Sequence, residues 1–373
     1  MAACKLLSRS WIAICLLAVS SLATAAVKPE PRNVVLVTLD GVRVQEMFGG
    51  LDVAVLQSAL GKDRRVEDHD LYRRYWAATP EARRAKLMPF FWNTLMQQSG
   101  SIAGNPARGS RVQVSNRMRI SYPGYAELLT GQARDADVTS NRKLRIPFPT
   151  VAEFVRRELA LQPAQVATFA SWETFDWIAE HTDGNTYVNA GFAPYPGNDP
   201  LIRQLDALQL QARAWPGERF DVFTQRFALA HLQRHRPRYL HIAYGNTDEW
   251  AHAGDYPATL QALALVDGYL QELWTWLQSQ PQYRDRTTLV ITTDHGRGNT
   301  PAEWANHNHD VEGAQNIWLA IVSPDDARRG EWHAAPTLQQ NQVAATVAAA
   351  LGLDYARQDP AAGQPIALQP PSR

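Results

Sequence analysis

Acidic and histidine side chains with the spacing of metal ligands recur along this chain. Asp248 and His252 stand four residues apart in DEWAH, which places them on one face if that turn is helical. Asp294 and His295 are adjacent in TTDHGRG, a glycine-containing loop that can turn both side chains inward. Asp40 ends an earlier apolar run, NVVLVTLD. Carboxylates and imidazoles without cysteine suit zinc, manganese or iron, so this set predicts a metal centre.

Two more histidines, His307 and His309, follow in the run NHNHD. A single His-x-His pair is common in polar loops, and the Asp-x-x-x-His spacing often occurs by chance. The prediction of a metal centre therefore depends on the order in which these motifs recur. The remaining described histidines have no such pattern, and we interpret them as structural: His69, His181, His231, His235, His241 and His333.

The run RISYPGYAELLTGQ carries a candidate nucleophile, Ser121, at the start of a short helical segment. Pro123 suits the first turn of a helix and Gly131 suits its end. Two interpretations are open from these residues alone. Ser121 is either an ordinary helix N-cap or a nucleophile at the positive end of a helix, where an anion can also bind.

Three near-continuous apolar runs indicate the strands that position these side chains. They end close to Asp40, Asp248 and Asp294, and such runs are typical of strands buried on both faces of a parallel sheet. Because ligands of such sheets bind beyond the carboxyl ends of the strands, the three acids should converge there. Helical segments alternate with the strands, among them TLQALALVDGYLQELWTWLQ with its apolar stripe and PTVAEFVRREL with a capping box. This alternation predicts an α/β fold.

The ends of the chain and one charged stretch are interpreted separately. Residues 1–25 combine Lys5 and Arg9 with a short apolar run and the small residues before Ala25, which predicts a secretory signal peptide cleaved after Ala25 and a secreted or periplasmic protein. Residues 26–355 are expected to form one catalytic domain, in which residues 44–111 are a helical insertion or cap near the site. The Pro-rich residues 356–373 are expected to be a flexible tail.

Charge and cysteine content exclude several classes of protein. Lysine plus arginine and aspartate plus glutamate balance at 37 each, so no basic excess indicates a nucleic-acid duplex as partner. Both cysteines lie in the predicted leader, so the mature chain would have neither a disulfide framework nor a thiolate metal site. After signal cleavage no stable membrane insertion is expected. The oligomeric state is left open.

In their order, these motifs resemble the alkaline phosphatase superfamily, especially its nucleotide pyrophosphatase/phosphodiesterase branch and related exported bacterial phosphatases. The resemblance extends from Asn33 to about Leu353, and the motifs are specific as a set. It implies a three-layer α/β/α sandwich around a mostly parallel sheet. It also implies two sets of metal ligands. One set is Asp248, His252 and His307, and the other is Asp40, Ser121, Asp294 and His295.

Two positions match the family less closely. The last ligand of the family usually stands in a His-Gly step, but here Asn308 replaces the glycine, so His307 and His309 remain alternatives. Asn141 stands at about the spacing after Ser121 at which the phosphodiesterase branch has an asparagine that contacts the phosphate.

The resemblance implies a two-metal hydrolase of phosphoric esters that acts through a phosphoseryl intermediate on Ser121. Its cofactors would be two zinc ions, with manganese or iron as an alternative at one site, and its partner would be a small-molecule phosphate ester. Monoester and diester substrates remain open. Five basic residues near Ser121 could serve a monoester or lie solvated at the surface: Arg117, Arg119, Arg142, Lys143 and Arg145.

Two other functions are alternatives. A sulfatase-like or phosphonate-ester hydrolase would share the fold, but Tyr125 stands where the sulfatase pattern C/S-x-P-x-R requires arginine. A non-catalytic, metal-containing binding protein would have lost some of the ligands, whereas all seven expected positions are filled.

Overall fold

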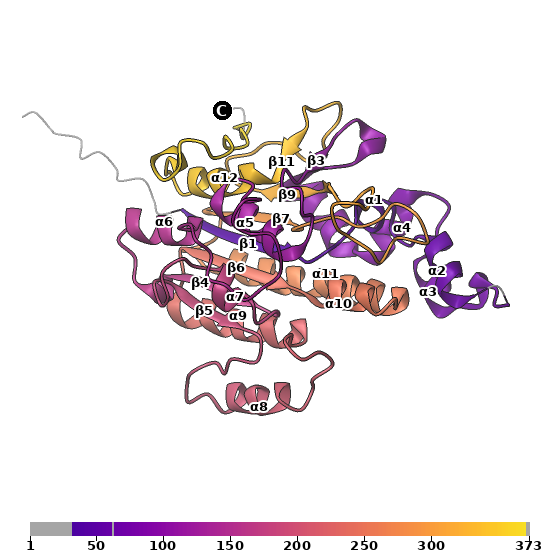
Figure 1. The fold of residues 1–373 in the computed structure, drawn as a ribbon, viewed down its shortest axis with the longest axis horizontal. Coiled ribbons are helices and arrows are strands. Elements are labelled where there is room, and N and C mark those ends of the chain that lie inside the picture. The colour runs from indigo at the N-terminus through magenta and orange to yellow at the C-terminus, as the bar shows by residue number, and fades with distance from the viewer. Residues whose placement is uncertain (1–31, 62, 371–373) are drawn as a thin grey trace, which may run out of the picture. The chain divides into compact units, whose positions relative to one another are not determined.

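The three apolar runs form the middle of an eight-stranded sheet in the computed structural model of the chain (Figure 1). The strand order is β10-β2-β9-β7-β1-β6-β4-β5. β1 pairs in parallel with both β6 and β7, and β4 continues the parallel part on the far side of β6. β9 is antiparallel to both of its neighbours, β7 and β2. The sheet is therefore mostly parallel, which confirms the predicted α/β class.

The strands of this sheet are β1 (Asn33–Leu39), β2 (Gly100–Ala103), β4 (Val166–Ala170), β5 (Tyr187–Ala190), β6 (Tyr239–Tyr244), β7 (Thr287–Thr292), β9 (Leu319–Val322) and β10 (Gly330–Glu331). A second, three-stranded sheet consists of β3 (Val112–Gln113), β8 (Asn316–Ile317) and β11 (Leu338–Gln339). The structure describes residues 32–61 and 63–370, so the predicted signal peptide, residues 1–25, lies outside the described residues.

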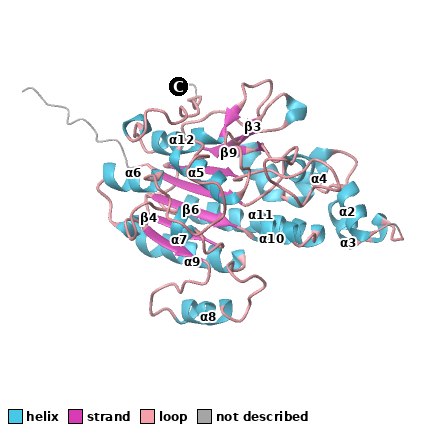
Figure 2. Cartoon of the chain, in the orientation of Figure 1, coloured by secondary structure: helices cyan, strands magenta, loops and turns pink. Residues whose placement is uncertain are grey.

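Helices cover both faces of the sheet (Figure 2). The first half of the chain contributes α1 (Val44–Gly49), α2 (Val53–Leu60), α3 (Asp70–Tyr75), α4 (Pro80–Leu87), α5 (Ser121–Thr130), α6 (Val151–Glu158) and α7 (Phe175–Ile178). The second half contributes α8 (Pro200–Gln209), α9 (Asp221–His235), α10 (Asn246–His252), α11 (Tyr256–Ser279) and α12 (Val343–Ala350). A π-helical segment, Phe91–Ser99, precedes β2.

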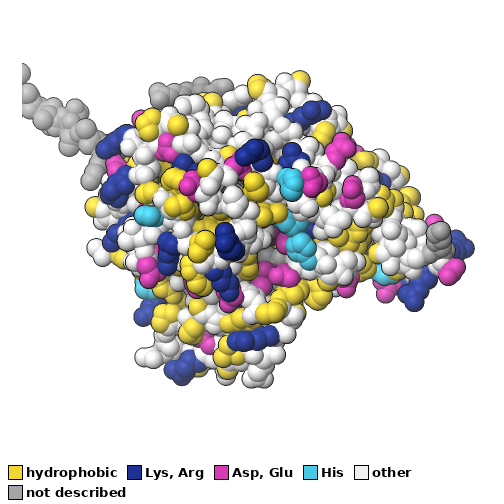
Figure 3. Space-filling view, viewed as in Figure 1, with side chains coloured by type: hydrophobic (Ala, Val, Ile, Leu, Met, Phe, Trp, Pro, Cys, Tyr) yellow, Lys and Arg dark blue, Asp and Glu magenta, His cyan; other side chains and the backbone are white. Residues whose placement is uncertain are grey.

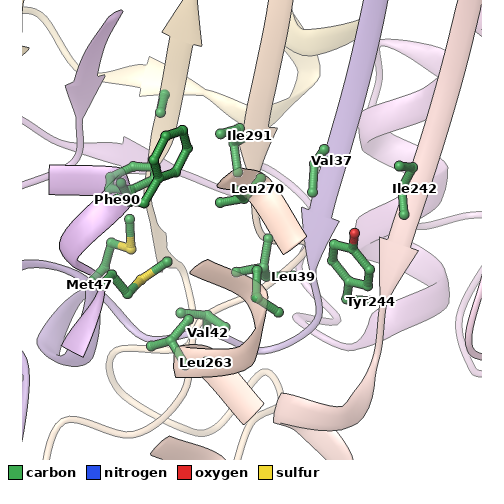
Figure 4. Packing of buried hydrophobic residues seen from close by; sticks show 14 of the residues in the cluster. Val37, Leu39, Val42, Met47, Phe90, Ile242, Tyr244, Leu263, Leu270 and Ile291 are labelled. Atoms are coloured by element: carbon green, nitrogen blue, oxygen red, sulfur yellow. The ribbon is translucent and has the colours of Figure 1, made fainter. Parts of the chain in front are cut away.

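The side chains of β1 alternate between two hydrophobic clusters, one on each face of the sheet. Val35, Val37 and Leu39 pack with α9, α11 and α1, whereas Val34 and Leu36 pack with α5, α6 and α12. Figure 4 shows the first cluster, where side chains of β1, β6 and β7 meet those of α11. The apolar stripe predicted for α11 is buried there: Leu263, Val266, Leu270, Leu273 and Leu277. The two clusters make the fold a three-layer α/β/α sandwich.

Two regions differ from expectation. Residues 44–111 contain the helices α1 to α4, but they also include β2, which lies inside the main sheet, so the stretch is not wholly an insertion. The end of the chain is not a loose tail over its described part. Ile366 is buried, its N–H donates to Thr346 Oγ1 at 3.0 Å, and Arg134 pairs with Asp359 at 3.0 Å. These contacts attach residues 356–370 to α12 and to the segment that follows α5.

Candidate metal centre and nucleophile

The predicted acids converge beyond the carboxyl ends of the three middle strands. Asp40 follows β1, Asp248 lies in α10 directly after β6, and Asp294 follows β7. All three side chains are buried. Because β1, β6 and β7 are parallel neighbours, their ends meet at one edge of the sheet. Figure 3 shows histidine side chains at the surface of the face viewed, with acidic side chains beside them.

Asp248, His252 and His307 form the first group of potential ligands, with one ligand atom of each within 4.8 Å of the others. α10 places Asp248 and His252 on one face, and His252 Nε2 lies 3.0 Å from Asp248 Oδ2. His307 Nε2 lies 3.1 Å from His252 Nε2. Its other nitrogen, Nδ1, is 3.1 Å from the carbonyl oxygen of Arg119, which can accept its proton and leave Nε2 as a lone-pair donor.

His309 lies apart from both groups. Its ring is 65% exposed and its Nε2 lies 3.1 Å from its neighbour Asp310. The structure therefore brings His307, and not His309, to the metal-ligand group. His241 and His231 are buried in the core, as interpreted from the sequence, although Nδ1 of His241 has no hydrogen-bond partner among the described residues.

Asp40, Asp294 and His295 form the second group. His295 Nε2 lies 3.4 Å from Asp40 Oδ1 and 3.5 Å from Asp294 Oδ2. The opposite nitrogen of His295 lies 3.0 Å from the carbonyl oxygen of Gly296, which turns Nε2 toward the carboxylates. Asp294 Oδ1 accepts the N–H of Gly41 at 3.1 Å. Both carboxylates are thus held on one side and open on the other.

Ser121 is the first residue of α5, and its Oγ lies 3.4 Å from His295 Nε2. The helix approaches the second group closely, because a Cβ on Gly124 would lie 2.5 Å from the carbonyl oxygen of Asp294. The N-cap position belongs to Ile120, and the Ser121 side chain does not cap the helix. The interpretation of Ser121 as the N-cap residue of α5 is therefore wrong. Its hydroxyl instead faces the second ligand group.

Asn141 supplies the missing cap from a distant loop. Its Oδ1 accepts the N–H of Tyr122, the second residue of α5, at 2.9 Å. The same loop is fixed by the Tyr122 hydroxyl, which donates to the carbonyl oxygen of Leu144 at 2.6 Å. Asn141 thus lies at the helix end that carries Ser121, with its amide oxygen bound to a helix N–H.

Burial and mutual repulsion perturb the titration of these groups. Burial, and after it the Asp40 carboxylate, raises the pKa of Asp294 to about 8. Burial alone would lower the pKa of His295, but Asp294 and Asp40 outweigh it and raise that pKa to about 9. Burial, and then the nearby His295, lowers the pKa of His307. The crowded carboxylates of the second group therefore favour a proton or a cation beside them, while His307 stays neutral with a free lone pair.

The two groups fit divalent metal ions. Asp40 Oδ1 and Asp294 Oδ2 are buried and have no hydrogen-bond partner within the described part of the chain. Such orphaned oxygens are costly unless a cation or a proton satisfies them. Together with the imidazole nitrogens, they form a set of oxygen and nitrogen donors that suits zinc, manganese or iron.

Two side chains at the site were not predicted from the sequence. Arg297 is fully buried, pairs with Asp248, and donates to the carbonyl oxygen of Gly41 at 3.2 Å. Tyr125 is buried on α5 and donates to Asp40 Oδ2 at 3.2 Å. Arg297 belongs to TTDHGRG and Tyr125 to the segment of Ser121. Their closeness to these motifs in the sequence is the one feature that could have pointed to a role at the site.

Known proteins resemble the chain in sequence and fold. The family model described as "Type I phosphodiesterase / nucleotide pyrophosphatase" matches residues 66–354. A curated protein of Leptospira interrogans, named "Probable 2,3-bisphosphoglycerate-independent phosphoglycerate mutase", is 32% identical over 65 residues. That match spans 17% of this chain and 11% of the relative's length.

Solved structures share the fold at low identity. A lipoteichoic acid synthase, LtaP, from Listeria monocytogenes superposes with a TM-score of 0.53 at 11% identity, over 88% of this chain and 74% of that one. A protein in the alkaline phosphatase superfamily from Vibrio parahaemolyticus gives 0.51 at 12% identity, over 91% and 71% of the two chains. The fold is therefore alkaline phosphatase-like, as the sequence motifs implied.

Proposed function

The chain belongs to the type I phosphodiesterase / nucleotide pyrophosphatase family, a branch of the alkaline phosphatase superfamily, and we propose that it hydrolyses phosphoric diesters with Ser121 as the nucleophile. One observation carries this proposal. Ser121 Oγ lies at the start of α5 and 3.4 Å from His295 Nε2, beside a group of buried carboxylates with unpaired oxygens.

We assign two metal ions to the site, zinc being the first choice and manganese or iron an alternative at one position. Asp248, His252 and His307 would hold one ion, and Asp40, Asp294, His295 and Ser121 would hold the other. When bound, two such ions supply Lewis acidity that stabilises negative charge on the attacking and leaving oxygens.

The residues of the chain then divide the reaction into two steps. Ser121 gives up its hydroxyl proton to solvent, its Oγ attacks phosphorus, and the ester bond to the first alcohol breaks, so that this alcohol leaves with a proton from water and a phosphoseryl intermediate forms. Water then attacks phosphorus, the bond to Ser121 breaks, a phosphomonoester is released, and Ser121 Oγ regains a proton. The partial positive charge at the start of α5 favours the anionic phosphoryl group in both steps. Asn141 keeps that helix end in place through its bond to the N–H of Tyr122.

The charge balance around Ser121 favours a diester over a monoester. A phosphomonoester carries close to two negative charges near neutral pH, whereas a diester carries one. Most of the flanking cations are already engaged by other groups of the protein. These contacts are Arg117 with Asp135, Lys143 with Glu173, Arg145 with Asp183, and Arg119 with the carbonyl oxygens of His309 and Val311. Three of the five flanking cations are thus paired with carboxylates, which reduces the positive charge available to a dianionic substrate.

Hydrolysis of two model esters tests the proposal. Wild type and Ser121→Ala are assayed on bis-p-nitrophenyl phosphate and p-nitrophenyl phosphate, with bound metal quantified in each. His309→Ala serves as a control because its ring is exposed and lies outside both ligand groups. We expect two bound metals, faster turnover of the diester, and loss of that turnover in Ser121→Ala only. Metal binding without hydrolysis of either ester would support the non-catalytic alternative instead.

We further propose that the chain is exported. The support is the basic, apolar and small-residue pattern of residues 1–25 in the sequence. Expression of the full chain in a bacterium, followed by N-terminal sequencing of the periplasmic fraction, tests it. The expected mature N-terminus is Ala26, and retention of the uncleaved chain in the cytosol would contradict export. Within residues 32–61 and 63–370, no helix is both long and apolar enough to span a bilayer.

A further inference from the structure

Tyr125 connects the helix of the nucleophile to a ligand of the second group. It lies four residues after Ser121 on α5, so both side chains lie on the same face of the helix. Its hydroxyl donates to Asp40 Oδ2 at 3.2 Å. We propose that Tyr125 is a positioning residue that orients the Asp40 carboxylate for the metal ion of the second group. This inference rests on the proposed function, since it assigns a role toward a metal that Asp40 helps to hold.

The hydrogen bond assigns different roles to the two oxygens of Asp40. Oδ2 accepts from Tyr125, whereas Oδ1 is buried, has no hydrogen-bond partner in the described chain, and lies 3.4 Å from His295 Nε2. Without the phenol, both oxygens would be free and the carboxylate could rotate about its Cβ–Cγ bond. Occupying Oδ2 leaves Oδ1 as the oxygen that faces the other ligands.

The packing of the Tyr125 ring fixes the direction of its hydroxyl. The ring is 1% exposed and makes an edge-on contact with Phe175, at 4.6 Å between centroids. On another side it faces His241, at 6.5 Å. His241 is itself held through Nε2, which lies 3.0 Å from Thr38 Oγ1 on β1. Neighbours from two elements, α7 and β6, therefore pack against the phenol and confine it beside Asp40.

The phenol of Tyr125 is a neutral donor. It supplies one hydrogen bond and no charge near neutral pH, so Asp40 keeps its full negative charge for a cation.

Metal titrations of the full-length protein test the inference. Wild type, Tyr125→Phe and a matched control, Tyr239→Phe, are stripped with a chelator and titrated with Zn²⁺ and Co²⁺. Tyr239 is also a fully buried tyrosine, but its hydroxyl has no hydrogen-bond partner among the described residues. We expect Tyr125→Phe to weaken one of two binding events about 10-fold, the usual effect of losing a partner of a metal ligand. Its Co²⁺ absorption spectrum should also change, and excess metal should restore hydrolysis.

The outcomes separate this inference from the proposed function. If wild type binds two ions and hydrolyses the diester while Tyr125→Phe titrates like wild type, the positioning role is overturned and the proposed function stands. An equal loss in Tyr239→Phe would also overturn it, because the effect would then reflect any buried phenol. If wild type binds no metal, the metal assignment and this inference both fail.

Discussion

The imidazole rings of His295 and His307 are stacked, with 3.9 Å between their centroids and 9° between their planes. Both rings come from the connection between β7 and β8, and each belongs to a different ligand group. The stacking therefore holds the two groups side by side. This arrangement suits the proposed reaction, in which both groups would face one phosphoryl group.

The paired variants His307→Ala and His309→Ala distinguish the two histidines of NHNHD. We expect His307→Ala to lose one of two bound metals and most of the diesterase rate, because its Nε2 lies 3.1 Å from that of His252. His309→Ala should keep both, since its exposed ring pairs with Asp310 and lies outside both ligand groups. Elemental analysis of the purified proteins measures the bound metal, and diester assays measure the rates. The reverse pattern would move the third ligand to His309.

The sequence predicted the middle of the sheet because those strands are buried on both faces. Their side chains are apolar without interruption, and the helix α11 carries a clear stripe at helical spacing. The short strands β2 and β10 carry no such pattern, so the stretch 44–111 looked like an insertion. The Pro-rich end looked flexible by composition, but its contacts, such as Arg134 with Asp359, are formed only in the folded chain.

Some residues of the site could be predicted from the sequence, and others could not. The candidate ligands could be predicted because carboxylates and imidazoles recur in a fixed order, with the three acids each close to the end of a strand. Tyr125 and Arg297 could not, since an aromatic or a basic residue beside a motif has many possible partners. The partners of these two side chains, Asp40 and Asp248, come from distant segments. The sequence also could not distinguish His307 from His309, because the path of the loop determines which of the two rings reaches the ligand group.

Asn141→Ala should lower both stability and activity. The substitution leaves the N–H of Tyr122 without its partner at the start of α5, and loss of a helix cap typically costs about 1 kcal/mol. The same loss should reduce kcat because Ser121 precedes Tyr122 directly. Urea unfolding and diester kinetics measure the two effects. Ser140→Ala is the control, and a wild-type kcat in Asn141→Ala would show that the cap does not position Ser121.

Arg297→Met should destabilise the protein far more than the removal of a charged side chain at the surface does. Arg297 is fully buried and paired with Asp248, and removing one partner of a buried pair typically costs about 3 to 5 kcal/mol. The metal bound by Asp248 should also be held more weakly, since the carboxylate loses its fixed partner. Arg117→Met, which breaks a pair at the surface, should cost less than about 1 kcal/mol.

Denaturant unfolding of the metal-loaded proteins compares the two arginine variants directly. A similar, small loss in both would mean that the buried contact with Asp248 contributes no more than a surface pair. Arg297→Lys adds a finer comparison, because one ammonium group cannot reproduce the contacts of the guanidinium with Asp248 and with the carbonyl oxygen of Gly41. We expect the lysine variant to lie between wild type and Arg297→Met.

His231 should make folding stability fall in mild acid. Burial is the main cause that lowers its pKa to about 4 in the folded chain, against about 6.5 when unfolded. Between pH 4 and pH 6.5, His231 is therefore mostly protonated in the unfolded state and mostly neutral in the folded state. The contribution is complete above about pH 6.5 and is lost as the pH falls toward 4, by up to about 3 kcal/mol.

The variant His231→Gln isolates this contribution from other titrating groups. Glutamine keeps a donor for the carbonyl oxygen of Ala164, which lies 2.8 Å from His231 Nε2, but it cannot take up a proton. Unfolding free energies of wild type and variant are measured in urea from pH 7 to pH 4.5. We expect the difference between the two proteins to shift in favour of the variant as the pH falls. A constant difference over that range would show that His231 has the same pKa in both states.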